Sequence, residues 1–215
     1  MSTVLVTGFG DYAEETDNPS GAIARRLDGR QVGDHRIVGS VLPVNTATVE
    51  SALVSALDRA RPDVVVVTGV APGRTAPALE RVALNVRDFP IPDTDGSTPI
   101  DEPVVVGGPP AYLATLPVKA VMDSWHRAGL PGYVSNTAGT YLCNQTFYLA
   151  RHLTAGTEVR AGMVHIPVVP ARATGDTTPL PSMPLALLEQ AVLVAISVSA
   201  QHDGPDLRLG AGAIS

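Results

Sequence analysis

Cysteine is almost absent from this sequence, since Cys143 is the single one in 215 residues. An internal disulfide needs two cysteines and a multi-cysteine zinc site needs several, so the sequence excludes both. A lone free thiol fits a reducing compartment. Lysine and arginine are also scarce, at 15 against 21 acidic residues, and they form no cluster. This distribution argues against nucleic acid and anionic membrane surfaces as partners.

Long apolar runs are missing as well. No stretch approaches the ~20 apolar residues that a membrane span needs. The N-terminus lacks a basic segment followed by an apolar core, so we expect no signal peptide and a cytoplasmic location. Hydrophobic residues still make up 45% of the chain, which is enough for a full core. The length suits one sizeable α/β domain or two small ones.

Strand-like and helix-like segments alternate from end to end. This alternation predicts an α/β fold, a three-layer sandwich in which helices flank a mostly parallel twisted sheet. We expect one domain over residues 1–200, a loose tail over 201–215, and an irregular excursion over the proline-rich segment 89–110. The predicted strands are 3–7, 36–41, 63–68, 80–86, 133–135 and 162–168, and the predicted helices are 19–27 with Asn18 as its cap, 46–60, 112–127, 142–153 and 185–199.

The stretch 135–148, which reads SNTAGTYLCNQTFY, surrounds the cysteine. A short strand, a turn that contains glycine and then a helix are predicted here, with Cys143 in the first helical turn. The first N–H groups of a helix have no internal partner, and the helix dipole is positive there. Both effects favour the thiolate, which is the nucleophilic form. The alternative is that Cys143 is only a small buried hydrophobic residue.

A cysteine nucleophile needs a base, usually histidine, and the base needs an orienting group. Of the five histidines, His165 is distinctive because the strand around it is otherwise apolar. Sequential strands usually neighbour, so we expect this strand beside the one that precedes Cys143. Glu80 is the candidate acid that holds the imidazole in the required tautomer. Its alternative role is an ion pair with Arg81.

The order and spacing of these three residues resemble the pyroglutamyl peptidase I family, also called pyrrolidone carboxylate peptidases. The resemblance covers most of the chain and rests on these stretches: VLVTGF at 4–9, NPS at 18–20, APGR at 71–74, ERVALN at 80–85, IPD at 91–93, SNTAGTYLCN at 135–144, HIP at 165–167 and PSM at 181–183. It implies that Cys143 is the nucleophile, His165 the general base and acid, and Glu80 the orienting acid.

The same resemblance implies a catalytic domain that removes an N-terminal pyroglutamyl residue from peptides. It implies no metal, no other cofactor, and a homo-oligomer, often a homotetramer. The substrate-binding residues that it suggests are Phe9, Tyr12, Asn18, Ile91, Tyr141 and Leu142.

Two positions depart from the family pattern. In the loop Phe9–Glu14, Tyr12 replaces the second phenylalanine of the pair that lines the lactam pocket, and its hydroxyl suggests an acyl group with a polar atom. Pro90 replaces an arginine of the family, and proline offers neither a side-chain donor nor an N–H. We therefore expect weak activity on simple pyroglutamyl amides.

Three functions are compatible with these residues. The leading one is a cysteine hydrolase that cleaves pyroglutamyl peptides through a thioester. The second is a cysteine hydrolase or cyclase that acts on another small acyl amide in specialised metabolism. The third is a non-catalytic binding protein on the same fold. The intact set of Glu80, Cys143 and His165 favours catalysis, with a small peptide or acyl amide as the partner and with neither nucleic acid nor membrane.

Overall fold

The computed structural model describes residues 2–12, 18–174 and 180–212. Its strands are β1 (Ser2–Phe9), β2 (Gln31–Val32), β3 (His35–Leu42), β4 (Val64–Val70), β5 (Ala78–Glu80), β6 (Val82–Leu84), β7 (Ala111–Leu113), β8 (Tyr133–Ser135) and β9 (Arg160–Ile166). Its helices are α1 (Pro19–Leu27), α2 (Val49–Ala60), α3 (Val118–Arg127), α4 (Leu142–Leu153), α5 (Pro170–Ala173) and α6 (Leu185–Gln201).

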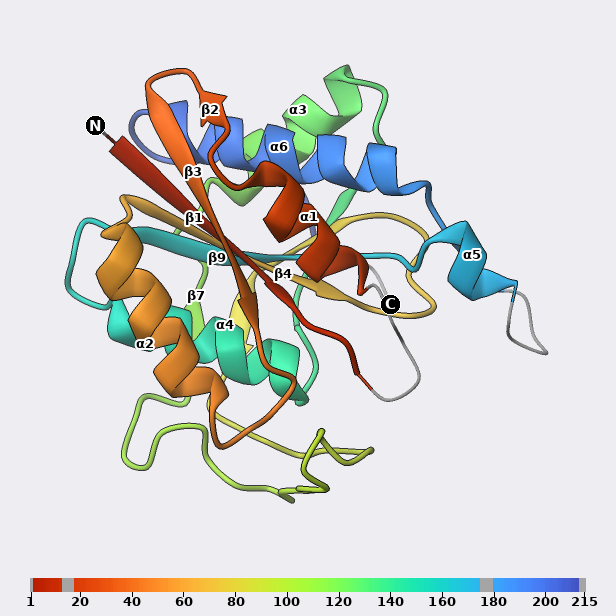
Figure 1. Ribbon diagram of the computed structural model, residues 1–215. Coiled ribbons are helices and arrows are strands. Elements are labelled where there is room, and N and C mark those ends of the chain that lie inside the picture. The colour runs from red at the N-terminus through yellow and green to blue at the C-terminus, as the bar shows by residue number, and fades with distance from the viewer. Residues whose placement is uncertain (1, 13–17, 175–179, 213–215) are drawn as a thin grey trace.

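Within these described ranges the main sheet has seven strands in the order β2-β3-β1-β4-β9-β5-β8. Figure 1 labels five of them: β2, β3, β1, β4 and β9. The four central strands β3, β1, β4 and β9 are parallel, whereas β5 and β8 run parallel to each other and antiparallel to β9. Helices α1, α3 and α6 cover one face, and α2 and α4 cover the other. The predicted α/β fold with a mostly parallel sheet is therefore confirmed.

One predicted neighbour relation is wrong. The strand of His165, β9, does not pair with β8, which precedes Cys143, because β5 lies between them and pairs with both. The chain reaches β5 through the loop that follows β4, and it enters the sheet in the opposite direction. As a result the strand that carries Glu80 is the direct neighbour of the strand that carries His165.

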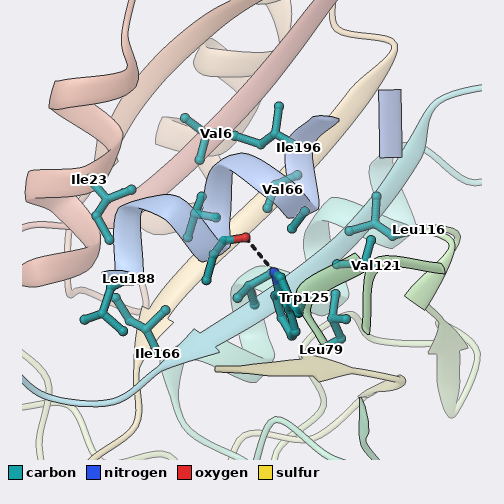
Figure 2. Close-up of a cluster of buried hydrophobic side chains, with 14 of the residues drawn as sticks. Val6, Ile23, Val66, Leu79, Leu116, Val121, Trp125, Ile166, Leu188 and Ile196 are labelled. Atoms are coloured by element: carbon teal, nitrogen blue, oxygen red, sulfur yellow. Dashed lines mark hydrogen bonds between the residues drawn. The ribbon is translucent and has the colours of Figure 1, made fainter. Parts of the chain in front are cut away.

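Alternate side chains of the central strands enter two different cores, as expected for strands covered on both faces. The core under α1, α3 and α6 contains Trp125, whose indole N–H donates to the Ala191 carbonyl at 2.8 Å (Figure 2). Val67 and Met163 enter the core under α2 and α4. His165 is two residues after Met163 and therefore faces the same side of the sheet, toward α4.

Most predicted elements shift by one to three residues at an end, and two differ more from the observed ones. The predicted strand 80–86 is divided at Arg81 into β5 in the main sheet and β6, which pairs with β7 in a second, antiparallel sheet. The predicted helix 112–127 begins only at Val118. Pro117 precedes this helix, and a residue before proline avoids the helical region, so 111–113 is free to form β7. The asparagine cap of α1 is confirmed, since Asn18 Oδ1 accepts from the Ser20 N–H at 3.0 Å.

The described part of the predicted tail, 202–212, contains no helix or strand but is attached to the body. The Asp206 carboxylate accepts from the N–H groups of Lys119 and Ala120 at 2.9 and 3.0 Å, and so caps the start of α3. The last tail residues, 213–215, lie outside the described residues. Across the described chain, no helix is long and apolar enough to cross a membrane.

Candidate active site

Cys143 is the second residue of α4, at the end of the helix that faces the carboxyl ends of β4 and β9. The two residues that follow it fix this helix start from opposite sides. Asn144 accepts from the Leu84 N–H at 2.9 Å and donates to the Leu84 and Val86 carbonyls at 2.9 and 3.0 Å. Gln145 exchanges hydrogen bonds with Thr46 at 2.7 and 3.0 Å. Both side chains are buried, so the backbone around Cys143 has little freedom.

Glu80 and His165 form a buried hydrogen bond of 2.7 Å between Oε1 and Nδ1. Their strands are antiparallel with Ala78 opposite His165, so Glu80 is the diagonal neighbour on the same face of the sheet. A carboxylate is an acceptor only, so it fixes the imidazole proton on Nδ1 and leaves Nε2 for the thiol. His165 interacts with Cys143 on its other side. The three predicted catalytic residues are thus brought together.

The charge of His165 depends on both neighbours. Burial lowers the pKa of His165, but its hydrogen bonds and charge interactions with Cys143 and Glu80 outweigh burial and raise the pKa to about 9. The imidazolium is therefore the stable form near neutral pH when it lies between a thiolate and a carboxylate. A thiolate and imidazolium pair of this kind combines a nucleophile with a proton donor.

Gly69, near the end of β4, packs against the side chains of Cys143 and His165. A Cβ added there would be 2.7 Å from Cys143 Sγ, 3.0 Å from Met163 Cε and 3.5 Å from His165 Cδ2. Real Cβ atoms essentially never approach other atoms as closely as 2.7 Å, so the sulfur occupies space that only glycine leaves open. The sequence shows a glycine here but not what lies above it.

Gly69→Ala is therefore expected to displace the nucleophile and lower kcat by about 100-fold, the typical cost of a 1 Å misplacement. Steady-state kinetics with circular dichroism as a check of folding would measure this. Gly10→Ala is a matched control, because its added Cβ would meet only ordinary contacts at 3.6 and 3.7 Å. Equal activity of the two variants would contradict the close packing of Gly69 against the thiol.

Sequence reasoning did not assign a role to Arg74, which also binds the acid. Arg74 Nη2 lies 2.8 Å from Glu80 Oε1. The alternative pairing of Glu80 with Arg81 is not found, since Arg81 donates to the Ala211 carbonyl in the tail at 3.1 Å. Arg74 lies in the stretch APGR that carried the family resemblance, but five residues of loop and strand separate it from Glu80, so only the fold shows the pairing.

The Cys143 side chain lines a cavity of about 620 Å³, which lies between the ends of β1 and β4 and the start of α4. All six predicted substrate-binding residues line it. The lining consists of Phe9, Tyr12, Asn18, Val44, Val70, Pro72, Ile91, Tyr141, Leu142, Cys143 and Arg172. Most of these side chains are apolar or aromatic, so the cavity suits a small ring with few polar atoms.

Two tyrosines that line this cavity are fixed in place by hydrogen bonds to the same backbone carbonyl. The hydroxyls of Tyr12 and Tyr141 both donate to the Pro92 carbonyl, the latter at 3.1 Å, and the Tyr141 ring packs on Phe89 at 4.5 Å. Burial, followed by the contact with Tyr12, raises the pKa of Tyr141, so it stays a neutral donor. The Tyr12 hydroxyl already has a protein partner, so the reason for expecting a polar acyl group is wrong.

Asn18 and Pro90 differ in their relation to the cavity. Asn18 uses its side-chain oxygen to cap α1, where it also accepts from the Ser20 hydroxyl at 2.7 Å. That hydroxyl accepts in turn from the Phe9 N–H at 3.0 Å, so Asn18 helps to place Phe9. Pro90 is exposed and is not part of the described lining. Residues 13 and 14 of the loop Phe9–Glu14 lie outside the described residues.

Among the described residues, no three His, Cys, Asp or Glu side chains are grouped so as to hold a metal ion. The site itself offers a thiol on a helix start, an imidazole with a fixed tautomer, and a buried ion pair next to that imidazole.

Comparison with known proteins agrees with this geometry. The sequence model of the family described as pyroglutamyl peptidase matches residues 2–202. The pyrrolidone-carboxylate peptidase of Pseudomonas fluorescens is 41% identical over 216 residues, which span 100% of each chain. That of Pyrococcus furiosus is 41% identical and covers 93% of this chain and 98% of its own.

Solved structures give the same result. The pyrrolidone carboxyl peptidase of Thermococcus litoralis superimposes with a TM-score of 0.94 at 34% identity, over 98% of this chain and 100% of its own. A variant of the Pyrococcus furiosus enzyme superimposes with a TM-score of 0.90 at 40% identity, over 93% of this chain and 98% of its own. The chain therefore belongs to the pyroglutamyl peptidase family.

Proposed function

We propose that this protein is a cysteine peptidase that removes an N-terminal pyroglutamyl residue from small peptides. The observation that carries the proposal is the series of contacts from Glu80 through His165 to Cys143, whose side chain lines a largely apolar cavity. Relatives of similar length with 41% identity are named pyrrolidone-carboxylate peptidases. A non-catalytic binding protein would not need a buried ion pair that orients a histidine toward a thiol.

The proposed reaction has two steps. In the first, Cys143 Sγ attacks the pyroglutamyl carbonyl, and the N–H groups at the start of α4 stabilise the oxyanion that forms. The His165 imidazolium gives its proton to the leaving amine as the C–N bond breaks, which leaves a thioester. In the second step, His165 takes a proton from water, the hydroxide attacks the thioester, and the thiol is released with pyroglutamate.

The cavity suits this substrate. Phe9, Ile91 and Leu142 offer apolar walls to the pyrrolidone ring, while Tyr12 and Tyr141 fix one wall through Pro92. A volume of about 620 Å³ is in the range of cavities that enclose small ligands. Asn18 holds the start of α1 at the rim and completes the proposed set of substrate-binding residues.

The location and assembly of the protein are part of the proposal. A catalytic cysteine without a disulfide partner fits the cytoplasm, where thiols stay reduced. Family resemblance supports a homo-oligomer, and a homotetramer is the state we propose. Size-exclusion chromatography with light scattering would measure the mass directly.

The proposal is tested with fluorogenic amides of the same leaving group. The pyroglutamyl amide should be cleaved, whereas alanyl, prolyl and glutamyl amides should not, because a charged α-amine or a missing lactam mismatches the largely apolar cavity. One equivalent of iodoacetamide should abolish the cleavage. Preference for another acyl group, or cleavage that survives alkylation, would reject the proposed function.

Pro90→Arg is expected to raise turnover of the pyroglutamyl amide. A lost oxyanion donor typically costs about 100- to 1000-fold in kcat, so the arginine should restore part of this. Ile91, the next residue, lines the cavity, so position 90 is adjacent in sequence to the cavity lining. Pro90→Ala is the control, since it removes the proline without adding a donor. If the two variants have the same kcat, the departure at this position is harmless.

A further inference from the structure

Arg74 links three parts of the site through one guanidinium group. Its Nη2 lies 2.8 Å from Glu80 Oε1 and donates to the Thr137 carbonyl at 3.4 Å. Its Nη1 donates to the Tyr133 hydroxyl at 2.9 Å, and its Cζ lies 5.8 Å from the Tyr133 ring centroid. The side chain thus connects the loop after β4 with β5, with β8 and with the turn that leads to α4.

The carboxylate of Glu80 depends on this cation. Glu80 is 0% exposed, and both of its contacts, from Arg74 and His165, are made by Oε1. Its Oε2 is buried without a hydrogen-bond partner in the described residues. A buried carboxylate is strongly unfavourable unless a cation and hydrogen bonds compensate it. Arg74, whose side chain is 20% exposed, is the permanently charged group that does so.

The contact with Thr137 ties the same guanidinium to the approach to the nucleophile. Thr137 belongs to the turn between β8 and α4, where the Ser135 hydroxyl also donates to its carbonyl at 3.1 Å. Gly139 in this turn has φ +77° and donates to the Thr137 hydroxyl at 3.1 Å. Displacement of Arg74 would therefore disturb both the acid and the turn that presents Cys143.

We propose that Arg74 is a positioning residue for the reaction: it keeps Glu80 charged beside His165 and holds the turn before Cys143. This rests on the proposed function, since it assumes that Glu80, His165 and Cys143 act together. The titratable and charged groups around the thiol and its partners are Glu80 from β5, His165 from β9, Cys143 from α4, Tyr133 from β8, Tyr141 just before α4, and Arg172, which lines the same cavity as Cys143. The charges of the Arg74 guanidinium, the Glu80 carboxylate, the His165 imidazolium and the Cys143 thiolate sum to zero.

Removal of Arg74 makes the site one charge more negative. A more negative site holds its protons more tightly, so the thiolate should form only at higher pH. A cation within 4–6 Å shifts the pKa of a neighbouring acid by about 1–3 units, and Arg74 reaches the thiol only through Glu80 and His165, so a shift at the lower end of that range is expected there. The rate of Cys143 alkylation rises with pH as the thiolate forms, and this rise is the acid limb of its pH profile. We therefore expect the midpoint of the acid limb to move to higher pH by about one unit in Arg74→Met. A residue with a merely structural role would change thermal stability without moving this limb.

The test measures the rate of Cys143 alkylation by iodoacetamide against pH in Arg74→Met, Arg74→Lys and Arg81→Met. Arg81→Met is the matched control, because it removes a cation next to Glu80 in sequence that binds the tail instead. Arg74→Met should move the acid limb upward. Arg74→Lys keeps the positive charge, so the acid limb should move little. The same variant should lower kcat, because one ammonium group cannot make the several hydrogen bonds of the planar guanidinium. Arg81→Met should leave the limb in place.

An unchanged acid limb in Arg74→Met, with circular dichroism showing a folded protein, would overturn the proposal. A limb that moves equally in Arg81→Met would also overturn it, because the effect would then be one of net charge. If Arg74→Met does not fold, Arg74→Lys still decides: kcat equal to that of the unmodified protein rejects the positioning role. Alkylation needs no substrate, so a wrong substrate assignment would appear only as absent turnover while the limb still moves.

Discussion

Cys143→Ala is expected to abolish turnover of a pyroglutamyl amide while the fold stays intact. Removal of the nucleophile from a serine triad costs about 10⁶-fold in kcat, and a thiol that forms the acyl-enzyme should be equally indispensable. The side chain is small and lies partly exposed at the cavity, so alanine leaves no large hole in the core. Asn144 and Gln145 hold the helix start independently of the thiol.

Kinetics and mass spectrometry together test this. The unmodified protein should take up one equivalent of iodoacetamide, and Cys143→Ala should take up none, since the chain has no other cysteine. The melting temperature of the variant should stay close to that of the unmodified protein. Retention of most activity in Cys143→Ala would show that the thiol mechanism is wrong.

Much of the fold is predictable because its signals are local. The valine run in β4 indicates a strand covered on both faces, and the cap Asn18 with Pro19 marks the start of α1. The order of strands is not local. Nothing in the sequence of β5 shows that it enters the sheet antiparallel to β9, since this depends on how the loop after β4 turns.

The site divides in the same way. Cys143 could be selected from the sequence because it is the single cysteine and stands at a predicted helix start, and His165 and Glu80 because they belong to otherwise apolar strand segments. Gly69 and Arg74 could not, because a glycine below a sulfur and an arginine across a loop acquire their roles only from tertiary contacts. The role predicted for the Tyr12 hydroxyl is wrong for the same reason, since its partner, the Pro92 carbonyl, is 80 residues away in the sequence.

Glu80→Gln is expected to lower kcat by about 10⁴-fold, the loss seen when an amide replaces the acid of a serine triad. The glutamine amide can donate to Nδ1, which moves the imidazole proton to Nε2 and removes the base that faces the thiol. Arg74 also loses its charged partner, so some loss of stability should accompany the loss of activity.

The pH dependence of Glu80→Gln is a second and independent readout. Contact with Glu80 is one of the causes that raise the pKa of His165 to about 9, so its removal should lower that pKa. His165 must be protonated to release the amine, so the alkaline limb of kcat/KM should move to lower pH. Stability that comes from the imidazolium is present below about pH 6.5 and is lost as pH rises through about 9 in the unmodified protein, so the variant should be less sensitive in this range.

Glu102→Gln is the matched control for this change. Glu102 also pairs with an arginine, Arg87, at 2.9 Å, but its side chain is 54% exposed and lies away from the cavity lining. An exposed ion pair contributes about 0–1 kcal/mol, so this variant should keep both its activity and its pH profile. If Glu80→Gln behaves like Glu102→Gln, Glu80 stabilises the fold but does not orient His165. If only Glu80→Gln loses activity and shifts its alkaline limb, the carboxylate acts through the imidazole that it holds.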